Sequence, residues 1–184
     1  MKLQKPAGFA KLIYPPISCR IVLLLVLTLL YSGNIQASST RALSIAELTK
    51  RSDVIVLGTV SAVSSDWNLD RTAIETRIDL KVEETLKGTI DQGKISFHQL
   101  GGKLGEIASS VGEAASFEEG ERVAVFLFKN NRDRFQLVGF FQGKFAVERN
   151  PKGQMAVRRI PGVSKPLDQL PLDNFKFQVQ EAIT

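Results

Sequence analysis

Cysteine is almost absent from this 184-residue chain, and the one present, Cys19, stands close to the N-terminus. The residues that follow it can therefore form no disulfide and no cysteine-based metal site. Cys19 also precedes the apolar run Ile21–Leu30, whereas the acylated cysteine of a lipoprotein follows such a run, so we predict no lipid anchor. About 145 residues can bury a core without disulfides, and we expect a single domain over 38–184.

Histidine is equally scarce, because His98 is the only one. Zinc sites draw three or four ligands from histidine, cysteine and carboxylates, and no calcium-loop or phosphate-loop pattern is present. We therefore predict no metal and no cofactor. A catalytic triad would have to combine His98 with Ser109 or Ser110, but no G-x-S-x-G nucleophile elbow accompanies them. A catalytic His98 stays open as an alternative to a surface or half-buried strand histidine.

Acidic residues are missing from the first 20 positions, where four of the 24 basic residues stand. The rest of the chain is nearly balanced, with 20 basic and 19 acidic residues. Nucleic-acid and anionic-membrane binding need a basic stripe on the folded domain. We therefore predict no nucleic-acid partner.

A long hydrophobic segment is also lacking, because the run Ile21–Leu30 has ten residues and a membrane-spanning helix needs about 20. Basic residues precede this run and the small residues 37–39 follow it, which is typical of a secretory signal peptide. We predict a signal peptide over 1–37, cleaved after Ala37 or Ser39, and a periplasmic or extracellular protein without a stable membrane anchor. An uncleaved anchor is the alternative, and the long basic n-region favours it.

The rest of the chain shows the patterns of β-strands. Residues 74–86 alternate apolar and charged side chains, which predicts a strand with one buried face. Residues 53–65, through Leu57, and residues 122–129 are apolar on both faces, which suits strands covered on both sides. Gly58 predicts a bulge or bend in the first of these. Four further strands are predicted, at 94–100, 135–141, 144–149 and 154–160.

Two helices are predicted, one at each end of the strand region. Residues 44–51 begin with Ser44 and Glu47 at capping-box spacing. Residues 173–183 form an amphipathic pattern. Together these elements predict a mainly β fold, a small antiparallel β-barrel with a short N-terminal helix and a C-terminal helix.

The loop Asp66–Asp70, after the first strand, is one candidate for binding. It holds the only tryptophan, Trp67, beside Asn68. Aromatic residues in loops serve as binding anchors, so we name both residues as candidate ligand contacts. A Trp67 that caps one end of the barrel is the alternative.

The glycine-rich stretch Gly101–Gly120 is the second candidate, and Lys103 and Glu106 are the contacts that we name in it. Loops of about 20 residues inside a compact domain are usually functional or disordered. A binding loop and a mobile connector both stay open here, with a helical turn expected at Glu106–Ser110. A proline-rich connector over 161–171 leads to the C-terminal helix.

The order of these elements resembles a family of uncharacterised exported bacterial proteins. More distantly, it is similar to the netrin-like domain of tissue inhibitors of metalloproteinases. The residues that carry the resemblance are Arg51–Val60 (RSDVIVLGTV), Lys81–Gly88 (KVEETLKG), Phe117–Leu127 (FEEGERVAVFL) and Phe140–Val147. The resemblance implies a five-stranded barrel of the OB or netrin-like type. In those inhibitors the first residue of the mature chain is a zinc-chelating cysteine, which has no counterpart here, so no inhibitory residue is carried over.

These observations favour an exported, non-catalytic binding module and not an enzyme. We expect its partner to be another extracytoplasmic protein or a small ligand. A netrin-like protease inhibitor that lacks the N-terminal cysteine is one alternative. A hydrolase that uses His98 is the other.

Overall fold

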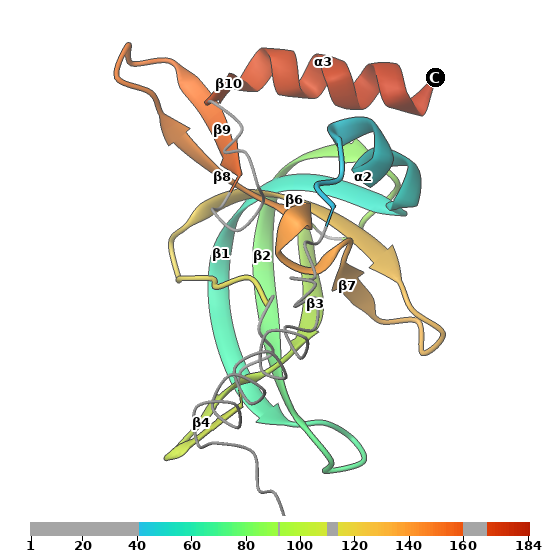
Figure 1. Ribbon diagram of the computed structural model, residues 1–184, viewed down its shortest axis with the longest axis vertical. Helices are drawn as coiled ribbons and strands as arrows, with labels where there is room; N and C mark the ends of the chain where they lie inside the picture. The colour runs from blue at the N-terminus through green and yellow to red at the C-terminus, as the bar shows by residue number, and fades with distance from the viewer. Residues whose placement is uncertain (1–40, 92, 110–113, 160–168) are drawn as a thin grey trace, which may run out of the picture. The chain divides into compact units, whose positions relative to one another are not determined.

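The computed structural model describes residues 41–91, 93–109, 114–159 and 169–184 (Figure 1). The predicted signal peptide over 1–37 and most of the proline-rich connector over 161–171 lie outside these ranges. Within them, no helix is both long and apolar enough to cross a bilayer.

Five strands close into a barrel, which confirms the predicted fold class. The strands are hydrogen-bonded in the order β1–β2–β3–β7–β6, and β6 pairs again with β1 to complete the ring. This is the strand order of an OB-type Greek-key barrel. All pairs are antiparallel except β3–β7, which is parallel and joined only at Phe97 and Phe135. The bounds are Val54–Trp67 for β1, Ile74–Lys87 for β2, Lys94–Leu100 for β3, Arg122–Lys129 for β6 and Phe135–Leu137 for β7.

The strand β6 and the first part of β1, through Leu57, are buried on both faces, as their sequences predict. Val56 of β1 and Val125 of β6 point into the barrel, where they join a core with Phe97. Ile55 and Phe126 point the other way, into a second core beneath the helices. Because successive strand residues face opposite sides, an uninterrupted apolar run is what a strand between two cores requires.

Two helices cover the outer core. The first, α2 (Ile45–Arg51), has the predicted capping box, in which the Ser44 side chain accepts from the Glu47 amide and Glu47 accepts from the Ser44 amide. The second, α3 (Leu172–Ile183), buries Phe175 at 5.3 Å from the ring of Phe145, measured between centroids. Figure 1 shows both helices at one end of the barrel and the tip of the β1–β2 hairpin at the other.

A smaller extension of the sheet continues past β6. It consists of β8 (Lys144–Arg149), β9 (Met155–Arg159) and β10 (Leu170–Pro171), all antiparallel. The two-residue strand β10 lies within the stretch that the sequence presents as an irregular connector. It ends at a proline, and an edge strand tolerates this residue because no further strand needs its amide.

The stretch 101–120 is more regular than predicted. It contains a hairpin of β4 (Gly102–Leu104) and β5 (Ile107–Ser109), so the expected helical turn from residue 106 is wrong. Gly105 has a φ of 61° at the first position of the two-residue turn, where a type II′ turn requires glycine. Residues 110–113 of this stretch are outside the described ranges.

Two other boundaries differ from the prediction. The strand expected at 135–141 ends at Leu137, because Gly139 and Phe140 adopt positive φ and lead into the 3₁₀ helix η1 (Phe140–Gly143). Trp67, placed by the sequence in a loop, is the last residue of β1. The bulge expected at Gly58 is confirmed by a register shift between Leu57 and Gly58.

Candidate ligand-binding groove

A polar depression lies over the outer face of β1, β2 and β3. It has a volume of about 510 Å³, and we call it the groove. Typical small-molecule sites measure about 300–1,000 Å³, so the groove is large enough for a ligand. Its lining residues are Ser64, Asp66, Trp67, Asn68, Leu69, Glu75, Arg77, His98 and Arg134.

The register of the strands explains why these side chains meet. Ser64 lies opposite Arg77, and Arg77 lies opposite His98 on the next strand. Their neighbours Ile78 and Phe97 belong to the inner core of the barrel, so alternation turns the polar side chains outward. Charges that appear in the sequence as one solvated strand face thus become the floor of the groove.

Two loops that are far apart in the sequence meet at the groove. Residues 68–73 connect β1 to β2, and residues 130–134 connect β6 to β7. Arg132 forms an ion pair with Asp70 at 3.2 Å, and Arg134 forms one with Glu75 at 2.8 Å. The second pair is the better shielded, since both its side chains are mostly buried. The shielded pair holds residue 134 against β2, whereas the exposed pair links the two loops and adds little stability.

Trp67 and Leu69 form the apolar part of the groove. The side chain of Trp67 is 42% exposed and that of Leu69 is 80% exposed. Exposed large apolar side chains that gather at one place mark interaction sites. The predicted contact Trp67 therefore lies where a ligand can reach it.

Asn68, the second predicted contact, is held by its own loop. Its side-chain oxygen accepts from the amides of Thr72 and Ala73, and its amide nitrogen donates to the Thr72 hydroxyl. This is the turn-stabilising role that asparagine often plays. Asn68 lines the groove, but its main task is to fix the loop in place.

His98 lies at the boundary between the groove and a second depression. Burial and the nearby positive charge of Arg134 lower the pKa of His98 below its ordinary value of 6.5. Its Nδ1 atom is buried and has no hydrogen-bond partner among the described residues. A neutral imidazole suits this position, since a charged ring would have to donate from both nitrogens.

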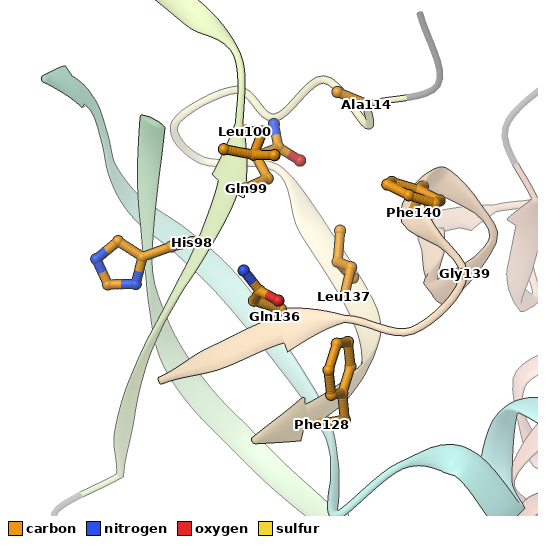
Figure 2. A pocket seen from close by; sticks show the side chains of 9 residues that line it. All are labelled: His98, Gln99, Leu100, Ala114, Phe128, Gln136, Leu137, Gly139 and Phe140. Atoms are coloured by element: carbon orange, nitrogen blue, oxygen red, sulfur yellow. The ribbon is translucent and has the colours of Figure 1, made fainter. Parts of the chain in front are cut away.

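The second depression is apolar, has a volume of about 230 Å³ and lies beside β3 and β7 (Figure 2). We call it the apolar pocket. Figure 2 shows Phe128, Leu137 and Phe140 around it, with the imidazole of His98 turned away from them. Phe140 is 58% exposed and adopts a left-handed backbone conformation with a φ of 56°. Reasoning from the sequence missed this pocket, because the pocket forms where two strands that are far apart in the chain meet.

The segment 114–121, which leads into β6 and lines the apolar pocket at Ala114, is held against the barrel by side-chain hydrogen bonds. Gln99 donates to the Ala115 carbonyl at 2.6 Å. The buried Lys144 ammonium donates to the Ser116 carbonyl and to Glu121, and it lies 4.3 Å from the Phe117 ring centre. Burial lowers the pKa of Lys144, while the contact with Glu121 opposes this shift. The chain that leads into β6 is thus held by a charged group inside the fold.

The other two predicted contacts do not belong to either depression. Lys103 lies on β4 and Glu106 in the turn that follows, both exposed, and neither lines the groove or the apolar pocket. The proposed nucleophile Ser109 is on β5 and does not share a depression with His98 either. Ser110 lies outside the described residues. In the described part of the chain, no three histidine or carboxylate side chains are placed to hold a metal ion.

Comparison with known proteins adds no assignment. Neither a protein-family model nor a curated protein matches this sequence. The resemblance to netrin-like domains stays a prediction.

Proposed function

We propose that the protein is an exported, non-catalytic binding module that holds its ligand in the groove. The observation that carries the proposal is the convergence of two distant loops on one strand face, where Arg132 pairs with Asp70 and the shielded Arg134 pairs with Glu75. In OB-type barrels, the face of the second and third strands and the loops beside it form the usual binding surface.

The chemistry of the groove supports binding over catalysis. The negative charge of Glu75 is paired with the positive charge of Arg134, and the side chain of Asn68 is hydrogen-bonded within its own loop. Catalysis by an acid or base needs a group within hydrogen-bond reach of its proton partner. His98 instead has its Nδ1 buried without a partner among the described residues. An aromatic side chain and fixed polar groups are what recognition requires.

Retention of ligand on immobilised protein tests the proposal. The wild-type protein, the double variant Trp67→Ser with Leu69→Ser, and the control Phe177→Ser are exposed to an extracytoplasmic extract of the source cells. Phe177 is a suitable control because it is an exposed apolar residue on α3 that lines neither depression. We expect the wild type and the control to retain the same component and the double variant to retain at least tenfold less. Equal retention by all three proteins would contradict the proposal.

The non-catalytic part has its own test. If wild-type protein chemically converts the retained component and His98→Ala does not, the protein is an enzyme. We expect no conversion by either.

The export part rests on the run Ile21–Leu30 and needs a separate measurement. We expect N-terminal sequencing of the protein from the periplasm or medium to begin at Ser38 or Thr40. A mature protein that retains residues 21–30 would support the anchor alternative.

A further inference from the structure

We infer that the ligand of the groove is an uncharged oligosaccharide, with Trp67 as the platform for one sugar ring. This inference rests on the proposed function, because it names the ligand class of the same groove. Three observations carry it: the charge balance of the lining, the exposure of the single tryptophan, and the fixed ion pair beside it.

The charges of the lining cancel. Arg77 and Arg134 contribute two positive charges, and Asp66 and Glu75 contribute two negative ones. Binding of single-stranded nucleic acid or another polyanion depends on a positively charged groove that follows the backbone. A groove with no net charge gives such ligands no electrostatic advantage, so it favours a neutral ligand.

The lining nevertheless offers many hydrogen-bonding groups. One guanidinium nitrogen of Arg134 donates to Glu75 at 2.8 Å, but a guanidinium group has five N–H donors and a carboxylate can accept about four hydrogen bonds. Asp66 accepts from the Trp67 amide through only one of its oxygens, Oδ1. Hydroxyl groups both donate and accept, so a polyhydroxylated ligand can use the remaining capacity of both kinds of group.

Trp67 supplies the apolar contact that such a ligand needs. A pyranose ring has an apolar face of C–H bonds bordered by hydroxyls, and the broad apolar surface of an indole matches that face. The side chain of Trp67 is 42% exposed at the edge of the groove, with Leu69 beside it. An aromatic platform next to paired charges is therefore complementary to a sugar, whereas a purely apolar ligand would leave the charges without new partners.

The fluorescence of Trp67 gives a direct test, because it is the only tryptophan in the chain. Wild-type protein is titrated with cellohexaose, maltohexaose and chitohexaose, each to about 10 mM, which is ten times a Kd of about 1 mM. Hexagalacturonate and a single-stranded deoxythymidine oligonucleotide serve as anionic probes. We expect a saturable change in emission with at least one neutral hexasaccharide and none with either anionic probe.

Two variants separate the groove from the rest of the surface. Arg134→Gln removes the guanidinium from the groove, and we expect it to weaken binding of the neutral sugar about tenfold, which corresponds to about 1.4 kcal/mol. Arg158→Gln breaks a similar ion pair, with Glu148 at 2.7 Å, outside the groove. We expect this control to bind like the wild type. Unchanged binding in Arg134→Gln would overturn the assignment of the site.

The titration of wild-type protein is decisive even if a variant fails to fold. No saturable change with any of the three neutral sugars, or tighter binding of an anionic probe, would overturn the inference. Neither result would affect the proposed function as long as the extract experiment still shows retention that depends on Trp67 and Leu69.

Discussion

Phe140 is one of three residues other than glycine that have a positive φ in the described part of the chain, and it is the aromatic one among them. Its φ of 56° lies in the left-handed region, which costs an ordinary residue about 1–2 kcal/mol and suits asparagine far better. Residues held in such conformations are concentrated at functional sites, and Phe140 lines the apolar pocket. The fold thus holds an exposed aromatic ring at the edge of a depression, at some cost in stability.

The first prediction follows from this strain. Phe140→Asn should raise the free energy of unfolding by about 1 kcal/mol, because the side chain is 58% exposed and loses little burial. The corresponding rise in Tm is about 3 °C, which thermal unfolding followed by circular dichroism can measure. Phe177→Asn is the control, and we expect it to change stability by no more than about 0.5 kcal/mol, because Phe177 is exposed. A fall in Tm for Phe140→Asn would show that the ring stabilises the fold.

The second prediction concerns the pH dependence caused by His98. Burial lowers its pKa, the positive charges of Arg134 and Arg77 act in the same direction, and the carboxylates of Glu75 and Asp79 oppose them. Between the lowered pKa and the ordinary value of 6.5, the unfolded chain binds more protons than the folded one. Stability therefore rises with pH in this window. The contribution is fully present above pH 6.5 and is lost as the pH falls through the folded-state pKa.

Chemical unfolding of wild type and His98→Asn at about pH 7.5 and pH 5 measures this contribution. We expect the wild type to lose more stability than the variant on acidification. The range stops at pH 5 because the carboxylates with lowered pKa values, such as Glu83 and Glu148, titrate in the unfolded chain near 4.5. An identical loss in both proteins would show that the burial of His98 does not affect its protonation.

On the scale of the elements, β1 carries a tight steric constraint at Gly58. A Cβ atom built on Gly58 would lie 2.5 Å from the backbone oxygen of Lys81 on β2. This close approach occurs at the register shift that bends the strand pair. Only glycine lets the two backbones come this close without a displacement of one strand.

The third prediction is that Gly58→Ala destabilises the protein by about 1–3 kcal/mol, as overpacking of a core typically does. The measurement is urea unfolding, compared with Ser64→Ala, an exposed substitution in the same strand. We expect the control to change stability by no more than about 0.5 kcal/mol. A neutral effect of Gly58→Ala would mean that β2 can shift freely at Lys81.

The elements also show which parts of the structure the sequence could predict. Long strands such as β2 are recognisable because a periodic pattern over more than ten residues has one buried face. The hairpin of β4 and β5 is not recognisable from the sequence, because each strand has only three residues and shows no periodic pattern. The expected strand at 135–141 is too long, because the strand ends where Gly139 and Phe140 adopt positive φ. A phenylalanine rarely adopts positive φ, so the sequence does not indicate that the strand ends there.

The candidate site is predictable only in part for a related reason. Trp67 can be named from the sequence, since a lone aromatic near a turn attracts attention. Arg134 and Glu75 are 59 positions apart, and their pairing depends on how the barrel closes. No local pattern indicates that the loop over 130–134 lies above β2. Sequence reasoning therefore finds one side of the groove and misses the other.

On the scale of the whole molecule, two cores share the same strands. The inner core fills the barrel, and the outer core lies between the barrel and the helices α2 and α3. Ile55 of β1 packs outward while its neighbour Val56 packs inward. A disturbance of the outer core must therefore act on strands that also form the inner core, and we expect the two to unfold together.

Phe175 on α3 allows a test of this coupling. Its side chain is fully buried, with its ring centre 5.9 Å from that of Phe126 on β6. Phe175→Ala should cost about 3–5 kcal/mol, a large part of the roughly 5–15 kcal/mol that stabilises a typical domain. Phe177→Ala is the matched control in the same helix, and its exposed ring should contribute less than about 0.5 kcal/mol.

Two probes of one denaturation experiment decide whether the cores unfold together. Circular dichroism reports on the whole backbone, whereas the fluorescence of Trp67 reports on the end of β1 away from the helices (Figure 1). If the cores are coupled, Phe175→Ala shifts both transitions by the same amount, as two-state unfolding requires. A Trp67 transition that stays at its wild-type midpoint would show that the barrel remains folded after the helices have separated. The groove would then be independent of the helical layer, and its ligand would stabilise the barrel alone.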